Sequence, residues 1–111
     1  MTPELTRSER RSWLLHQRLS SHLTRSSFES WRHCIERNLR RLREGVSGEP
    51  HRRHLERWAS LVNRGDVPGI HRALTGLDRE SIEMREVSPM GGLLPQLERA
   101  EVLRGADAPP L

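Results

Sequence analysis

The sequence predicts an all-α protein, a compact array of about five to six short helices in one domain. Three observations predict it. Apolar residues recur at helical spacings of three and four, capping pairs precede those runs, and the chain has no alternating run of β-branched residues. A chain of 111 residues with 33% hydrophobic residues supports one modest core. We therefore expect a helical domain over residues 1–105 and a flexible tail over residues 106–111.

The first helix is predicted to begin at a capping box. Thr6 and Glu9 stand three residues apart, so their side chains can satisfy backbone amides left unpaired at a helix start. Apolar residues then recur every fourth position, at Leu15, Leu19 and Leu23. This spacing places one face of the helix against a core.

The second helix is expected to be a central core element. A further capping box, Ser26 to Glu29, opens it, and Gly45 is expected to end it. Its apolar stripe is the longest in the chain and comprises Phe28, Trp31, Ile35, Leu39 and Leu42. The spacing of this stripe is that of a single buried helix face.

Four shorter helices are predicted after Gly45. Pro50 suits the first turn of one helix, and Asp66, Asp78 and Pro95 suit the starts of the next three. The residues expected to face inward are Leu55, Trp58, Leu61, Val62, Ile70, Leu74, Ile82, Leu97, Ala100 and Leu103. Glycines 65 and 76 are expected stops.

Residues that could carry catalysis or bind a metal do not converge. His51 and His54 share a helix face, but no third ligand follows at a metal-site spacing. Cys34, the single cysteine, lies beside the buried stripe and fits a small core residue in a reducing compartment. We therefore expect no enzymatic activity, no catalytic residue, no metal and no cofactor.

The charge is uneven and favours a polyanion-binding alternative. All 19 basic residues are arginine, and residues 1–64 carry a net charge of +7 although the whole chain has only +4. The candidate nucleic-acid-binding residues are Arg37, Arg40, Arg41 and Arg43. The tryptophans Trp13, Trp31 and Trp58 could stack on bases, but their helical register favours the core.

The stretch from Arg85 to Arg99 interrupts the helical pattern. Pro89 restricts the residue before it to extended geometry, and Gly91 and Gly92 allow the chain to reverse. Two outcomes follow: the apolar residues of this turn fill the end of the core, or they form a docking patch for a partner. Met90, nearest the tip of the turn, is expected to contact that partner.

The same stretch carries a resemblance to a known group. It has an arginine, Ser-Pro, a large apolar residue, glycine, two apolar residues, then Glu-Arg and Val-Leu. The matching residues are Arg85, Ser88, Pro89, Met90, Gly91, Gly92, Leu93, Leu94, Glu98, Arg99, Val102 and Leu103. In this pattern the chain resembles small actinobacterial regulator or antitoxin-like proteins, some of which are attached to a helix-turn-helix domain.

The resemblance implies a bacterial binding or regulatory module that neutralises or regulates a protein partner, such as a toxin. The expected partner-binding residues are Arg85, Ser88, Pro89, Met90, Gly91, Gly92, Leu93, Leu94 and Arg99. The two flanking arginines, Arg85 and Arg99, can alternatively donate to carbonyls left free inside the fold, and we expect Arg85 to take that internal role. The alternative is a small arginine-rich regulator that binds nucleic acid. No apolar run is long enough for a signal peptide or a membrane span, so we expect a cytoplasmic location.

Overall fold

A computed structural model describes residues 4–107, which form helices and no strand, as the sequence predicts. The elements are α1 (Arg7–His22), α2 (Arg25–Gly45), α3 (His51–Asn63), α4 (Val67–Thr75), α5 (Arg79–Met84), the 3-10 helix η1 (Arg85–Val87) and α6 (Gln96–Asp107). Within this part of the chain the all-α fold class is confirmed.

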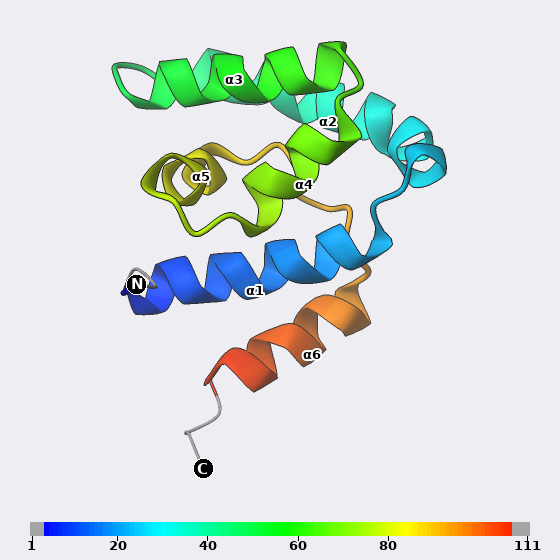
Figure 1. Ribbon diagram of the computed structural model, residues 1–111, viewed down its shortest axis with the longest axis vertical. Helices are drawn as coiled ribbons and strands as arrows, with labels where there is room; N and C mark the ends of the chain where they lie inside the picture. The colour runs from blue at the N-terminus through cyan, green and yellow to red at the C-terminus, as the bar shows by residue number, and fades with distance from the viewer. Residues whose placement is uncertain (1–3, 108–111) are drawn as a thin grey trace.

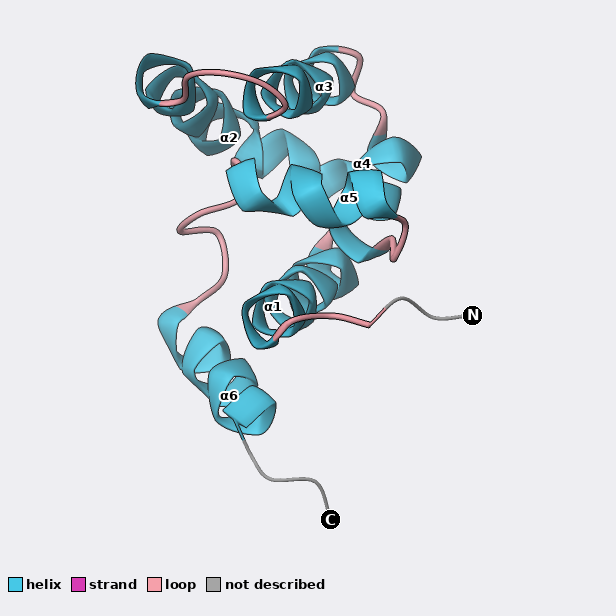
Figure 2. Cartoon of the chain, turned by 90° about the vertical axis from the view of Figure 1, so that its left-hand side faces the viewer, coloured by secondary structure: helices cyan, strands magenta, loops and turns pink. Residues whose placement is uncertain are grey.

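The helices lie in tiers along the longest axis of the molecule, which measures 42 Å (Figure 1). Helices α2 and α3 form one end, α4 and α5 lie in the middle, and α1 follows them. Helix α6 lies beyond α1 and forms the opposite end, which Figure 2 shows from the side. The segment that leads to α6 therefore crosses the molecule from the middle tier.

Side-chain caps begin most of the helices. Thr6 and Glu9 form the predicted capping box of α1. The box predicted at Ser26 is wrong, because the N-cap of α2 is Thr24 and its box partner is Ser27. The Ser27 hydroxyl also donates to the His22 carbonyl at 2.8 Å, so it joins the end of α1 to the start of α2.

The later helix starts follow the predicted residues. Pro50 precedes α3, and the carboxylates of Asp66 and Asp78 accept from backbone amides of the first turns of α4 and α5. Gly65 has a φ of +60°, a backbone conformation that favours glycine, and it follows the end of α3. The capping residues of the sequence thus set the boundaries of these helices.

The core lies between α2, α3, α4 and α1. Trp58 is fully buried in it, and its indole nitrogen donates to the Met84 carbonyl at 2.7 Å. Phe28, Ile35 and Leu39 form the buried part of the α2 stripe. Trp31, expected to be a core residue, is only partly buried and packs against the cluster from its side. Trp31 lies at the edge of the stripe, which explains its partial exposure.

Helix α6 departs most from the expectation. Leu97 and Ala100, predicted to face inward, are exposed, and Leu97 keeps 87% of its accessible surface. Residues 106 and 107, predicted to begin a flexible tail, belong to α6, and the rest of that predicted tail lies outside the described residues. The ion pairs of α6 with α1 explain this different register.

Candidate functional site

Two helices hold the connecting loop (residues 88–95) that links η1 to α6. The hydroxyl of Ser88 lies 2.8 Å from the Nε2 atom of His16 on α1. The Asn38 side chain on α2 donates from Nδ2 to the carbonyls of Pro89 and Gly91, both at 2.9 Å. The loop is therefore a specified structure, fastened at its start and at its turn.

His16 is a neutral, buried hydrogen-bonding residue. Its Nδ1 atom lies 2.6 Å from the Ser12 carbonyl, which can only accept, so Nδ1 carries the proton and Nε2 accepts from Ser88. Burial lowers the pKa of His16 to about 4; the bond to Ser12 opposes this effect, and the positive charge of Arg85 adds to it. The Ser88 oxygen also accepts from the Met90 amide at 3.2 Å, which completes the network.

Part of the predicted partner-binding set fills the core instead. Pro89 is fully buried, and Met90 is only 4% exposed. Contact of either residue with a partner stays a prediction, and the burial shows only that both belong to the fold. Of the two outcomes predicted for this turn, Pro89 and Met90 follow the first, in which they fill the end of the core. The reason is that Asn38 holds the carbonyls on either side of Met90 against α2.

Arg85 is also an internal residue. Its guanidinium donates to the Ala73 carbonyl at 3.0 Å and to the Gly76 carbonyl at 2.8 Å, at the C-terminal end of α4. Burial lowers the pKa of Arg85, and the carboxylates of Asp78 and Glu9 oppose that effect. Arg85 therefore satisfies helix-end carbonyls within the fold.

Most residues of the set border a groove of about 680 Å³ between α1, the connecting loop and the first turn of α6, here termed the loop groove. Leu15, Leu19 and Leu94 give it an apolar lining, and the exposed Arg99 also borders it. The predicted residues that line it are Ser88, Met90, Gly91, Gly92, Leu94 and Arg99. Leu93 packs partly against the core.

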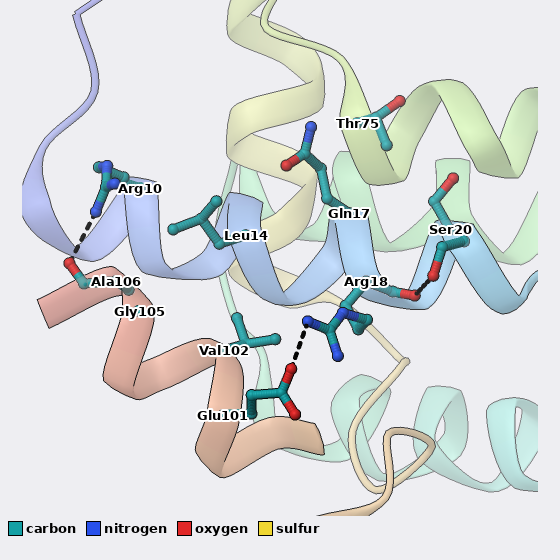
Figure 3. A pocket seen from close by; sticks show the side chains of 11 residues that line it. Arg10, Leu14, Gln17, Arg18, Ser20, Thr75, Glu101, Val102, Gly105 and Ala106 are labelled. Carbon is teal, nitrogen blue, oxygen red and sulfur yellow. Dashed lines mark hydrogen bonds and ion pairs between the residues drawn. The ribbon is translucent and has the colours of Figure 1, made fainter. Parts of the chain in front are cut away.

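A second hollow, also of about 680 Å³, lies further along α1 and α6 (Figure 3). Leu14 of α1 and Val102 of α6 line it, with Thr75 at the end of α4. Figure 3 shows Val102 pointing from α6 toward α1, while the Arg18 and Glu101 side chains meet beside it. The two helices are thus joined at their polar positions, with open space between these contacts.

Ion pairs fasten α6 to α1. Arg18 binds Glu98 at 3.1 Å and Glu101 at 3.3 Å, and His22 lies 2.7 Å from Glu98. Near the other end, Asp107 pairs with Arg7 at 3.3 Å. Hydrogen bonds from His22 and Arg18 lower the pKa of Glu98. No residue of α6 is buried, so the polar side of this helix, and not its leucines, sets its rotation on α1.

The candidate nucleic-acid-binding residues on α2 divide into two kinds. Arg37, Arg40 and Arg41 are exposed and pair with no carboxylate within the part of the chain that the structure describes. Arg43, by contrast, donates to both carboxylate oxygens of Glu56, at 3.2 and 3.3 Å. Three of the four residues therefore present free positive charge.

The thiol, histidine and carboxylate groups that could react or bind a metal are dispersed over the described residues. Cys34 is a partly buried free thiol beside the α2 stripe. Over residues 4–107 the histidines, cysteine and carboxylates form no group of three that could hold a metal ion. None of the described helices combines the length and the apolar character needed to cross a membrane.

Comparison of the chain with protein-family models, with curated proteins and with solved structures finds no match. Sequence reasoning overlooked His16 and Asn38, the two residues that position the connecting loop. A signal for each was present: His16 stands three residues before Leu19, and Asn38 occupies a stripe position three residues after Ile35. A polar residue at an inward position needs a buried partner.

Proposed function

We propose that the chain is a non-enzymatic protein-binding module, and that its partner docks on the end formed by α6 and the loop groove. One observation carries the proposal: α6 contributes no buried residue, and Leu97, which is 87% exposed, follows Gln96, a residue that lines the loop groove. A helix usually buries one apolar face. Here Val102 faces α1, but Leu97 and Ala100 are exposed and could be covered by another protein.

The charges at this end favour an acidic partner. The acidic residues of α6 are directed to basic residues of α1, whereas Arg99 and Arg104 pair with no carboxylate among residues 4–107. A partner segment with a large apolar side chain and a nearby carboxylate would fill the loop groove and bind Arg99. Guanidinium groups bind carboxylates through two parallel hydrogen bonds, which makes such contacts specific.

The Ser88 and His16 pair supports a binding role over a catalytic one. A general base works best when its pKa lies near the working pH, and the pKa of His16 is lowered to about 4. Protonated His16 would be a buried cation near the positive charge of Arg85, which disfavours proton transfer from Ser88. The pair instead fixes the edge of the loop groove.

The resemblance to antitoxin-like proteins makes a small toxin the first partner to test. The probe is the protein encoded by the neighbouring reading frame, and its affinity is measured by isothermal titration calorimetry. We expect Leu97→Asp and Arg99→Glu each to weaken binding at least about tenfold, which corresponds to about 1.4 kcal/mol. Both side chains are exposed, so the fold should be retained in both variants.

The matched control is Arg40→Glu, which reverses an exposed charge on α2 at the other end of the molecule. It should leave the affinity unchanged. If Arg40→Glu weakens binding and Leu97→Asp does not, the partner surface lies on α2 and the proposal is wrong. If the neighbouring protein does not bind, a photo-crosslinking residue at position 97 compared with one at position 40, used in the native host, tests the surface itself.

A further inference from the structure

The arginines of this chain fall into two classes once their contacts are known. About half form ion pairs with carboxylates or donate to backbone carbonyls. The others have no carboxylate partner within residues 4–107. They are Arg25, Arg37, Arg40, Arg41, Arg52, Arg53, Arg72, Arg99 and Arg104. The position of the second class, and not the total count, shows where free positive charge is exposed.

Six of these unpaired residues lie on two consecutive helices, and Arg25 stands apart from the others at the start of α2. The other five are Arg37, Arg40 and Arg41, later on α2, and Arg52 and Arg53 at the start of α3. Figures 1 and 2 show α2 and α3 side by side at the end of the molecule away from α6. The bond from Arg43 to Glu56 joins the two helices. We term these five residues the arginine face.

We propose that the arginine face binds the phosphate backbone of a double-stranded nucleic acid. All five side chains are exposed, and guanidinium groups bind phosphate oxygens with charge-assisted hydrogen bonds. Exposed Glu44 and Glu49 belong to the same end of the molecule and reduce its net charge, so the contact is electrostatic and moderate in strength. No groove-reading motif accompanies it, and binding should be independent of sequence.

The aromatic residues favour a duplex over a single strand. Single strands are gripped by bases stacked on exposed aromatic side chains. Trp58 and Phe28 are buried, Trp31 packs against the core, and Trp13 donates its indole N–H to the Thr75 carbonyl. The arginine face therefore offers charge without a stacking platform.

The apolar residues also disfavour a membrane surface as the polyanion. Peripheral helices that bind membranes present large apolar side chains beside their basic residues. Within the described residues Leu97 is the exposed large hydrophobic side chain, and it lies on α6 at the opposite end. Helices α2 and α3 can therefore bind phosphate groups, but they present no large apolar side chain for insertion into a membrane.

Fluorescence anisotropy with a labelled mixed-sequence duplex DNA, titrated at several salt concentrations, tests the proposal. The logarithm of the affinity should fall with the logarithm of salt concentration with a slope of about −4 to −5, because each phosphate neutralised contributes about −0.9. The variant Arg37→Gln, Arg40→Gln, Arg41→Gln should reduce the magnitude of that slope by about 3 and weaken binding at low salt at least tenfold.

The control variant Arg72→Gln, Arg99→Gln, Arg104→Gln removes the same number of unpaired arginines from other helices. It should keep the wild-type slope. Equal losses in both triple variants would show that only net charge matters and would overturn the proposal. Tighter binding to a single strand of the same length, or binding to phosphatidylserine vesicles without binding to duplex, would overturn the assignment of the ligand.

Discussion

The side chains of His16 and Ser88 lie 2.8 Å apart and join α1 to the loop that carries the groove. Because His16 is buried and its pKa is lowered to about 4, the imidazole is neutral at pH 7 and its Nε2 atom accepts from the Ser88 hydroxyl. Protonation would place a positive charge in this buried site and reverse the direction of the bond. The stability of the loop and the protonation of His16 are therefore linked.

This linkage gives a pH dependence of stability. In the unfolded chain His16 takes up a proton near its ordinary pKa of 6.5, whereas in the folded chain it stays neutral down to about pH 4. The stabilisation is complete above pH 6.5 and is lost as the pH falls from 6.5 to 4, by up to about 3 kcal/mol. Urea unfolding at a series of pH values measures it.

The variant His16→Gln cannot titrate, so its stability should change much less between pH 6.5 and 4.5. His33→Gln, which changes an exposed histidine on α2, should keep the wild-type dependence. A wild-type stability that is flat across this range would contradict the linkage.

The burial of Met90 leads to a second prediction. Met90→Asp places a carboxylate in a site that is 4% exposed, so it should lower the free energy of unfolding by roughly 3 kcal/mol or more. Met90→Leu keeps the apolar volume and should cost less than about 1.5 kcal/mol. Thermal and urea denaturation compare the two variants. Equal stability of Met90→Asp and wild type would mean that the side chain points to solvent.

The tryptophans should differ in their contributions to stability. Trp58→Ala empties a fully buried site and leaves the Met84 carbonyl without its donor, so it should cost roughly 3–5 kcal/mol. Trp31 is only partly buried, and Trp31→Ala should cost about half as much. Urea unfolding midpoints provide the comparison. A larger loss for Trp31 than for Trp58 would place the centre of the core on α2.

Helix α6 should separate from α1 more readily than the other helices separate from the core. Its ion pairs are partly exposed, so salt screens them, and protonation of Glu98 breaks them at low pH. The pKa of Glu98 is lowered in the fold, so its contribution is present at neutral pH and is lost as the pH falls through that lowered pKa.

Amide hydrogen exchange measured at low salt and at about 0.5 M salt checks this separation. Protection of α6 should fall at the higher salt while protection of α3 is retained. Arg18→Gln should reproduce the effect at low salt, and Arg64→Gln, which removes an exposed pair with Asp66, should not. Unchanged protection of α6 in high salt would show that packing, and not charge, holds it.

Much of the fold follows from short-range signals in the sequence. The capping residues Thr6, Asp66 and Asp78 start their helices because each side chain accepts from the backbone amide three positions ahead. The apolar spacing of α3 and α4 likewise predicts their buried faces, since helical geometry alone puts such residues on one side. These features need no knowledge of the neighbours of a helix.

Two features of the last third of the chain were decided by the tertiary structure: the position of Met90 and the rotation of α6. Whether Met90 fills the core or faces a partner depends on Asn38 and His16, which lie 52 and 74 residues earlier. The rotation of α6 depends on where Arg18 and His22 stand on α1. Hydrogen bonds and ion pairs between residues distant in the sequence leave no periodic pattern in the segments that they join. Local spacing therefore determined the helices of this protein, and long-range polar contacts determined its surfaces.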